Sequence, residues 1–538
     1  MAVKCNSKKV AKFLLWTSIA ILIVSTVLLI VFPTIYKNQL KKQITLTEGS
    51  VITSIWEDIP LPLYEELYFF NITNGEDFVK GAPLNVSEVG PYTYKGKWVK
   101  RYPQWNSNGT VSYRETRTYH FVPEMSVGSQ DDEIYTLNGP MAIAASIVKN
   151  YPWWLKIIVS AALKIKDENL ITRKKIRELV YDGYNDIIIK IAPTIKPDIP
   201  YKNGRFAWLY GKNATDDGVF TVFTGAENAS VTNFINTWNG QERLDFWKGD
   251  TCNMMNGTSI ETGPPIDGYQ ETYTFFQSIF CRSLTFNYTR DVTHYGILSK
   301  RFEATYEIFA NGSENPNNYC FDVQPGLASG VLDVSACQFG APVLISFPHF
   351  HMADPSYLEK INGLQPNAEN RDSYMDVDPV TGMSLYLNVK FQVNVQLQRV
   401  QGIFQLDDIQ EGIYPIFWAA LSLEIDQDMA DFYYRNLKRP EIIGYGVLSA
   451  VVFLCIIGII VSLIILRKER GEFPLINEEE KSPENKRPIH KSSKHSNYGS
   501  QGTLKCDEAS ETVSSAVEEE NKALDLVGDD SALTINNP

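Results

Sequence analysis

Hydrophobic residues are most concentrated near the two ends of the chain. One uncharged run covers residues 13–32 and a second covers residues 442–466. Each is longer than the about 18 apolar residues that a membrane-spanning helix needs. Neither has the polar stripe that a long helix in a soluble core normally shows. We therefore predict transmembrane helices over residues 13–36 and 442–466.

A cleaved signal peptide is the alternative explanation of the first run. Its apolar stretch is long for a signal peptide, and the bulky sequence PTIYKNQL follows it in place of a small-residue cleavage site. We favour an anchor that stays in the mature protein. Lysine and arginine flank both runs on both sides, so the distribution of positive charge does not decide the orientation.

Between the two runs, single positions alternate between apolar and polar over residues 385–398, LYLNVKFQVNVQLQ. This period of two predicts a strand with one buried and one wet face. A strand of this length is typical of a large curled sheet or barrel. The segments GVFTVFTG (218–225) and APVLISFPHF (341–350) are further predicted strands, bounded by glycine and proline.

One part of this middle segment, residues 140–191, has a helical pattern. It predicts three helices, over residues 140–150, 153–166 and 169–191. The second is almost entirely apolar but too short to span a bilayer. It is expected either to pack into a bundle or to offer an apolar surface to a partner.

This helical segment is basic, whereas the whole chain is acidic. Residues 149–190 contain nine basic and five acidic residues, and the chain has a net charge of −13. Such a cluster on an acidic domain is suited to capture anionic or amphipathic ligands. The alternative is a solvated helix face whose lysines and arginines simply point into water.

Eight N-glycosylation motifs lie between the apolar runs and none lies outside them. Because glycans are added in the secretory lumen, this confinement predicts that residues 37–441 are extracellular or lumenal. Residues 1–12 and 467–538 are then cytosolic, and the protein resides in the plasma membrane, the endosome-lysosome membrane or both. The acceptor residues are Asn71, Asn85, Asn108, Asn213, Asn228, Asn256, Asn287 and Asn311.

The cysteines agree with an oxidising compartment. Four of the seven lie in the predicted lumenal segment, and an even number there indicates two disulfides, with three connectivities open. Zinc binding is the alternative, but the C-x-x-C spacing of zinc sites is missing. Cys5 would lie near the inner membrane face, where it is either a palmitoylation candidate or a free thiol.

The C-terminal segment, residues 467–538, is polar and has only two aromatic residues, which predicts a disordered tail. Leu475 and Ile476 resemble a dileucine sorting signal read by a cytosolic adaptor. The acidic residue usually found four positions before the leucine is replaced by Gly471, and Glu472 follows one place late.

No catalytic motif is present, so we expect a non-enzyme without cofactors. His349 and His351 would share a strand face, which is a metal-binding geometry. A third ligand is not evident, so structural roles and no metal site are favoured. Compartment and acidity exclude nucleic acids as partners.

Seven short segments together resemble the class B scavenger receptors, a family that includes a fatty-acid translocase, a lysosomal integral membrane protein and insect members. They cover nearly the whole chain except the tail, in the family's order. The segments are VGPYTYK (89–95), FVPEMSVG (121–128), DGVFTVFTG (217–225), FFQSIFCRS (275–283), NPNNYCF (315–321), VLDVSAC (331–337) and PVLISFPHF (342–350).

The resemblance implies an α+β fold. A large antiparallel β-barrel ectodomain would carry a helical apex bundle over residues 140–191, enclose a hydrophobic tunnel and be anchored by two terminal transmembrane helices. It also implies the disulfides Cys252–Cys320 and Cys281–Cys337. A further cysteine of the vertebrate fatty-acid translocase is replaced by Asp322, so an insect-type or lysosomal relative is the better match. The apex residues implied to bind ligands are Lys164, Lys166, Lys174 and Lys175.

We therefore predict a receptor that binds lipids, lipoproteins or lipid-carrier proteins and transfers lipid to the membrane through the tunnel. The alternative function is trafficking or recognition of a protein ligand or apoptotic cells in the endosomal system. A small-residue pair, Gly446 and Ala450, suggests homo-oligomers through the second membrane helix. No histidine lies between His120 and His294, which argues against release of cargo by a pH-sensing apex histidine.

Overall fold

The computed structural model describes residues 7–165, 169–195, 203–367 and 371–470. Six residues named above lie outside these ranges: Cys5, Lys166, Gly471, Glu472, Leu475 and Ile476. Residues 471–538 of the predicted tail also lie outside them.

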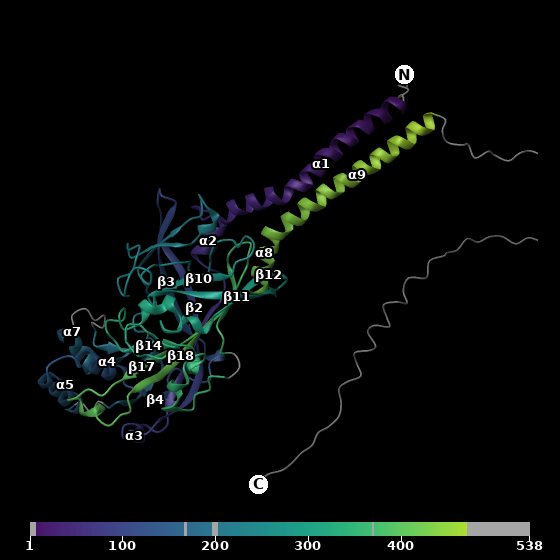
Figure 1. Ribbon diagram of the computed structural model, residues 1–538. Coiled ribbons are helices and arrows are strands. Elements are labelled where there is room, and N and C mark those ends of the chain that lie inside the picture. The colour runs from purple at the N-terminus through teal and green to yellow at the C-terminus, as the bar shows by residue number, and fades with distance from the viewer. Residues whose placement is uncertain (1–6, 166–168, 196–202, 368–370, 471–538) are drawn as a thin grey trace, which may run out of the picture. The chain divides into compact units, whose positions relative to one another are not determined.

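The centre of the fold is a large sheet that curls into a nearly closed antiparallel barrel (Figure 1). Its strand order is β10-β11-β12-β16-β17-β18-β1-β2-β3-β8-β9, with β14 on β17, β13 on β14, and β15 on β2 as the one parallel pair. The bounds are β1 Leu63–Ile72, β2 Leu84–Trp105, β3 Thr110–Phe121, β8 Val219–Phe223, β9 Ile235–Trp238, β10 Thr272–Gln277, β11 Arg282–His294, β12 Ile297–Glu303, β13 Leu332–Asp333, β14 Val343–Ser346, β15 Ile361–Asn362, β16 Tyr374–Val377, β17 Ser384–Leu397 and β18 Gly412–Glu424.

Strand β17 confirms the strand predicted from the alternation over residues 385–398. Its polar face differs from the expectation, because Gln392 and Asn394 are fully buried instead of wet. Gln392 donates to Asn394 over 2.7 Å and accepts from the backbone N–H of His349 over 2.6 Å. The segment after β14 thus covers this part of the strand, and a local hydrogen-bond network replaces water.

Helices α4 Gly139–Val148, α5 Trp153–Ile165 and α7 Ile187–Ile195 lie at the end of the barrel remote from the terminal helices (Figure 1). Helix α6, Ile176–Val180, lies between α5 and α7 in the chain. Helix α4 begins where the Asn138 side chain accepts from the backbone N–H of Met141, with Pro140 in the first turn. Helices α4 and α5 confirm the first two predicted helices of the segment 140–191.

The third predicted helix, over residues 169–191, is wrong as a continuous element. The β-branched Ile171 and Thr172 start strand β5, Ile171–Lys175, which pairs with β4, Glu133–Leu137. After α6 the chain turns at Gly183, whose φ of +70° suits a residue without a Cβ. Short strands β6 Tyr184–Asn185 and β7 Arg205–Phe206 pair around α7.

The chain leaves the barrel through two long apolar helices, α1 Ser7–Ile44 and α9 Arg439–Glu469, which run side by side (Figure 1). Both are long and apolar enough to cross a membrane. Helix α8, Gln427–Tyr433, and a π-helical turn, Tyr434–Lys438, lead into α9. The ring of Phe32 on α1 meets the edge of Tyr445 on α9, with the centroids 4.9 Å apart.

Short elements complete the described chain. The helices are α2 Val51–Glu57 and α3 Gly75–Phe78, and the 3-10 turns are Pro123–Met125, Ala229–Val231, Tyr306–Ile308, Pro316–Phe321, Pro348–Phe350, Pro355–Leu358 and Phe404–Leu406.

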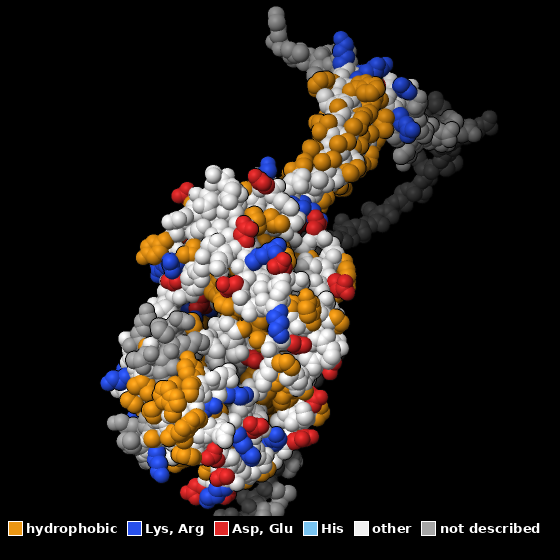
Figure 2. Space-filling model, turned by 60° about the vertical axis from the view of Figure 1, so that its left-hand side comes forward, with side chains coloured by type: hydrophobic (Ala, Val, Ile, Leu, Met, Phe, Trp, Pro, Cys, Tyr) orange, Lys and Arg blue, Asp and Glu red, His pale blue; other side chains and the backbone are white. Residues whose placement is uncertain are grey.

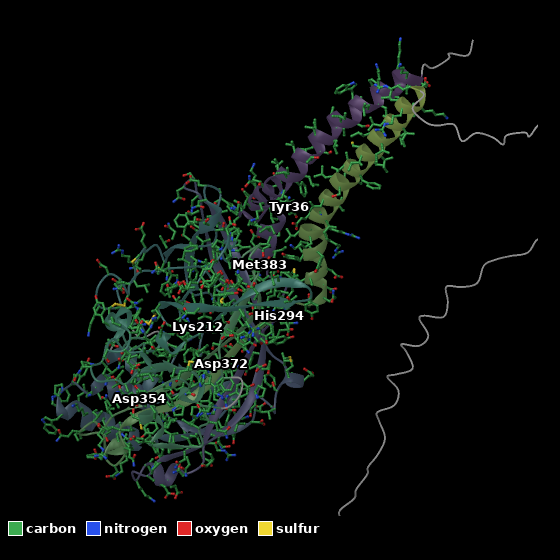
Figure 3. All side chains as sticks on the ribbon, turned by 45° about the vertical axis from the view of Figure 1, so that its right-hand side comes forward. Tyr36, Lys212, His294, Asp354, Asp372 and Met383 are labelled. Carbon is green, nitrogen blue, oxygen red and sulfur yellow. A yellow bond between two sulfur atoms is a disulfide. The ribbon has the colours of Figure 1, made fainter. Side chains whose placement is uncertain are left out.

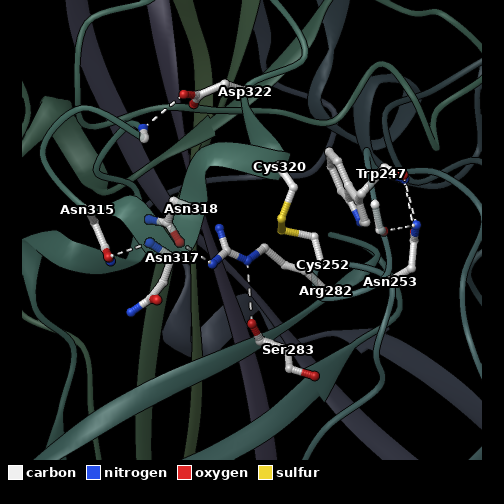
Figure 4. Close-up of a disulfide and its surroundings, with 12 residues drawn as sticks. Trp247, Cys252, Asn253, Arg282, Ser283, Asn315, Asn317, Asn318, Cys320 and Asp322 are labelled. Atoms are coloured by element: carbon white, nitrogen blue, oxygen red, sulfur yellow. Dashed lines mark hydrogen bonds between the residues drawn. A yellow bond between two sulfur atoms is a disulfide. The ribbon is translucent and has the colours of Figure 1, made fainter.

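Both predicted disulfides are present: Cys252 is bonded to Cys320, and Cys281 to Cys337. Figure 4 shows the first of them beside the buried side chain of Arg282, which stacks 3.8 Å from the ring centroid of Phe321. This guanidinium donates to the Asn318 side chain over 3.2 Å, and burial lowers its pKa to about 9. The disulfide region is therefore a packed part of the core.

Candidate functional site

A cavity of about 980 Å³ lies between the helical end and the barrel. Helices α4, α5 and α7 provide one side of it, and strands β14, β17 and β18 provide the other. Residues that represent these six elements are Ile147, Leu163, Ile188, Ile345, Phe391 and Phe417. A cavity of this size and lining is within the range of small-molecule sites in proteins.

The helical pattern of α5 explains how one element serves two surfaces. Val159 and Leu163, one turn apart, line the cavity. Trp154 and Ile158, also one turn apart, point away from it and are 52% and 57% exposed. Residues four apart share a helix face, so the inward and outward faces of α5 are both apolar.

The outward face of α5 belongs to a larger exposed apolar patch at the helical end of the molecule. We call it the apex patch: Tyr151, Trp153, Trp154, Ile158 and Phe404. Trp153 is the most exposed, at 75%. Figure 2 shows hydrophobic side chains gathered at this end, with basic side chains near them. A contiguous exposed patch of this kind marks a surface that contacts a partner or a lipid.

Two hydrogen bonds of the Ser160 hydroxyl fix the parts of the apex patch relative to one another. Ser160 of α5 donates to the Gln405 side chain over 2.9 Å and accepts from the backbone N–H of Phe404 over 3.0 Å. The turn that carries Phe404 is therefore held against α5. Residues 139–165 contain three lysines, Lys149, Lys156 and Lys164, and no acidic residue.

The four lysines implied by the resemblance do not form a single cluster among the described residues. Lys164 is exposed on α5, and Lys166 lies outside the described residues. Lys174 and Lys175 lie on β5, where Lys174 sits 4.2 Å from the ring centroid of Tyr184. The Lys175 ammonium is 3.1 Å from an Asp131 carboxylate oxygen.

The polar part of the cavity lining is grouped around Asp217. This carboxylate is 2.6 Å from the Lys212 ammonium and accepts from the Ser278 hydroxyl over 2.9 Å. Its other contact is Arg117, at 3.5 Å. Burial alone would raise the pKa of Asp217, but Arg117 and Lys212 outweigh burial and lower it, so the group is charged. The Cys281–Cys337 disulfide also lines the cavity.

The prediction that His349 and His351 share a strand face is wrong, because strand β14 ends at Ser346 and His349 lies in the 3-10 turn Pro348–Phe350. Each histidine has its own local partners. His349 is 2% exposed, bonds through Nε2 to the Glu88 carboxylate and accepts the backbone N–H of Gln365 at Nδ1 over 3.0 Å. His351 contacts the Pro366 carbonyl and Asp372 instead. Within the described ranges, no group of three His, Cys, Asp or Glu side chains is placed to hold a metal ion.

Sequence reasoning missed a set of ion-paired charges of which Lys100 on β2 and Glu115 on β3 are buried and Arg117 on β3 and Asp217 are partly exposed. Charged residues on a strand normally indicate its wet face, so the alternation in these strands predicts the opposite location. One sequence signal was available. Glu115 and Arg117, two positions apart and of opposite charge, would share a face of one strand, and Lys100 lies on the strand before it.

The structure defines a class of protein with two terminal helices long and apolar enough to cross a membrane, a nearly closed barrel, and a large apolar cavity beneath an exposed apolar apex. The profile of the CD36 family matches residues 16–466, and the chain belongs to this family.

Curated relatives agree with this membership. Scavenger receptor class B member 1 of Bos taurus is 32% identical over 443 residues, which cover 82% of this chain and 86% of the relative. The mouse protein of the same name is 33% identical over 421 residues, covering 78% and 82%. Human lysosome membrane protein 2 is 35% identical over 418 residues, covering 77% and 86%.

Proposed function

We propose that this protein is a receptor that engages lipid-bearing ligands with its apex patch and takes lipid into the cavity beneath. The observation that carries the proposal is the position of α5, whose opposite faces line the apex patch and the cavity. A ligand held at the patch is then one helix away from an apolar interior. Transfer onward to the bilayer along the barrel needs no covalent chemistry.

The driving force for lipid entry is the removal of hydrocarbon from water. Burial of apolar surface stabilises a bound chain by roughly 25 cal/mol per Å². The aliphatic and aromatic walls provide this burial, and the few polar residues around Asp217 lie together in the lining. An elongated, mostly apolar ligand is the class that fits this arrangement.

The composition of the apex favours a phospholipid-covered ligand, such as a lipoprotein, over a bare protein. Exposed tryptophans beside lysines, without acidic residues over 139–165, are typical of helices that lie in a lipid interface. The lysines attract the phosphate groups of the lipid and the indole rings enter the headgroup region. Among the four apex lysines proposed for this role, Lys164 is on the same helix as the tryptophans.

The test is a double variant, Trp153→Ala with Trp154→Ala. We expect about tenfold weaker binding to lipoprotein particles or phospholipid vesicles, since two interfacial aromatic anchors are lost. Surface plasmon resonance on immobilised vesicles measures it. Tyr319→Ala removes an aromatic residue of 62% exposure elsewhere and is the matched control. Equal affinity of the double variant and the control would contradict the apex proposal.

We also propose that both termini are cytosolic and that the barrel is lumenal or extracellular. The eight glycosylation motifs support this orientation, and Asn108, Asn228 and Asn256 have exposed side chains suited to modification. A mass decrease on treatment with an N-glycosidase is expected. An unmodified chain from a secretory cell would contradict the orientation.

A second candidate function is endosomal or lysosomal trafficking of a protein ligand. The similarity to proteins named lysosome membrane protein 2 favours it. The sorting residues Leu475 and Ile476 lie outside the described residues, as does the lipidation candidate Cys5. Changing Leu475 and Ile476 to alanine is expected to shift the protein to the cell surface, as seen by surface biotinylation. An unchanged distribution would remove the sorting signal from the account.

A further inference from the structure

Four charged side chains of alternating sign form a row of ion pairs that is buried at one end and partly exposed at the other. We call Asp217, Arg117, Glu115 and Lys100 the ion-pair chain. Neighbouring groups are 3.5 Å apart for Asp217 and Arg117, 2.8 Å for Arg117 and Glu115, and 3.0 Å for Glu115 and Lys100. The Lys100 and Glu115 side chains are 1% and 5% exposed.

One end of the ion-pair chain lines the large cavity, and the other end lies over a residue that lines a second pocket. Asp217 belongs to the lining of the large apolar cavity, whereas Arg117, Glu115 and Lys100 do not. At the other end, the Lys100 ammonium lies 5.5 Å from the ring centroid of Trp56.

Trp56 lines a small apolar pocket of about 30 Å³. Ile44, the last residue of α1, and Met383 also line this pocket. In Figure 3, Met383 lies close to the terminal helices and Lys212 lies farther along the barrel. The ion-pair chain therefore connects the wall of the large cavity to the pocket beside the membrane helix.

The members of the ion-pair chain are held in their charged states. Burial alone would lower the pKa of Lys100, but Glu115 and Glu261 outweigh burial and raise it. Burial alone would raise the pKa of Glu115, but Lys100 and Arg117 lower it. Glu261 is 4% exposed, and one of its carboxylate oxygens has no hydrogen-bond partner. The hydrocarbon of a passing lipid cannot replace the charged partners of Lys100 or Glu115, because it offers neither a charge nor a hydrogen bond.

We propose that the ion-pair chain is the polar barrier that separates the large cavity from the membrane-side pocket and determines how fast lipid passes between them. The inference rests on the proposed lipid-receptor function and adds the residues that limit its transfer step. Lipid enters the large cavity freely and is retained there. Passage of lipid from the large cavity toward the membrane requires the ion-pair chain to open. The ion-pair chain therefore limits the transfer of lipid and not its entry into the large cavity.

The test uses the full-length protein in vesicles, with a pyrene-labelled fatty acid as the probe. Lys100→Met with Glu115→Leu removes both charges of this pair together, so neither is left facing the site of the other, and Arg117 keeps its contact with Asp217 at 3.5 Å. Two quantities are measured: the amount of probe bound by the protein at equilibrium, and the rate at which the probe reaches the bilayer. We expect bound probe within about twofold of the wild type and transfer about tenfold faster.

The matched control is Lys97→Met with Asp58→Leu. This ion pair also involves β2 and also spans 3.0 Å, but its side chains are 62% and 47% exposed. This control variant removes the same number of charges at exposed positions. Its rate of probe transfer to the bilayer is therefore expected to equal that of the wild type.

A second variant keeps the test decisive if the first one fails to fold. Arg117→Met with Asp217→Leu removes the cavity end of the chain, where the side chains are 24% and 13% exposed, and leaves Lys100 paired with Glu115. It is expected to raise the transfer rate about threefold. Folded variants that transfer at the wild-type rate would overturn the barrier, while wild-type protein that neither binds nor transfers the probe would overturn the proposed function with it.

Discussion

The His349 imidazole shows how a single buried residue links this fold to pH. Its Nδ1 accepts the Gln365 N–H, so its Nε2 carries the proton that is donated to Glu88. This tautomer is neutral, and burial lowers the pKa of His349 below its usual value of 6.5. Protonation of His349 would put a hydrogen on Nδ1, where it would face the Gln365 N–H and break that hydrogen bond.

The folded and unfolded pKa values determine the sign of the pH effect. Because the folded pKa of His349 is the lower one, its contribution to stability is present above pH 6.5 and is lost as the pH falls through the folded pKa. The pKa of Glu88 is also lowered: burial opposes this, but its bonds to His349 and Trp418 prevail. Glu88 therefore also contributes stability that is lost on acidification, but at a lower pH, below 4.5.

His349→Gln tests this account. The wild-type melting temperature is expected to fall from about pH 7 to about pH 5, and the variant, which does not titrate there, should show a smaller fall. Differential scanning fluorimetry across this range measures both. His351→Gln is the control, because His351 is less buried and makes no contact with Glu88. An identical pH slope in His349→Gln and the wild type would show that His349 does not carry the effect.

At the residue scale, the sequence predicted cysteine pairing through the resemblance but not the buried charges. The pairs Cys252–Cys320 and Cys281–Cys337 follow from matched motifs. Lys100 and Glu115 become interior only because β2 and β3 lie side by side, with Lys100 opposite Glu115 in the register. One strand read by itself does not contain that information.

At the scale of elements, glycines determine how α9 packs on α1. A Cβ on Gly444 would lie 2.1 Å from the ring of Phe32, and one on Gly458 would lie 2.6 Å from the Ser18 hydroxyl. A Cβ on Gly446 would meet nothing within 4 Å. Close helix approach through small residues is the usual basis of packing between membrane helices.

Gly444→Leu is therefore expected to separate α1 from α9 and to lower the melting temperature of the full-length protein in detergent by several degrees, equivalent to about 1–3 kcal/mol of overpacking. Gly446→Leu, two residues away on the same helix, should leave the α1–α9 contact intact and lower the melting temperature less, because a Cβ there meets nothing within 4 Å. Thermal unfolding followed by tryptophan fluorescence compares the two. A similar loss in both variants would show that the α1–α9 contact is not specific to Gly444.

The same comparison bears on the predicted homo-oligomer. The Gly446 face makes no close contact within the described chain, so it remains the proposed surface for a second copy. A smaller oligomer in Gly446→Leu, measured by light scattering, would support this proposal. An unchanged oligomeric state would remove Gly446 from it.

Element prediction succeeded where the local pattern was strong. The alternation over residues 385–398 became β17, and the apolar segments near Met141 and Trp153 became α4 and α5. The segment over 169–191 failed because its first part is a strand only through pairing with β4, about 35 residues earlier in the chain. Pairing between distant segments is a tertiary effect that local propensity does not report.

At the scale of the whole molecule, the tethered barrel places the apex patch far from the paired helices (Figure 1). The barrel and its two terminal helices were predicted from the resemblance. A large apolar cavity lies beneath the apex helices, and the predicted tunnel from there to the membrane stays a prediction. The volume of this cavity, and the charges beyond it, depend on side-chain packing between segments as distant as Ile143 and Phe417. No pattern along the sequence contains these quantities.

If this protein takes up lipid, the large cavity is the site that holds it. Photo-crosslinking of the full-length protein in membranes with a fatty acid that carries a diazirine and an alkyne, followed by mass spectrometry of labelled peptides, tests this. We predict labels on peptides that contain cavity residues such as Leu163, Phe391 and Phe417, reduced by excess unlabelled fatty acid. Labels confined to α1 and α9, which every membrane helix would acquire from the bilayer, would contradict the account.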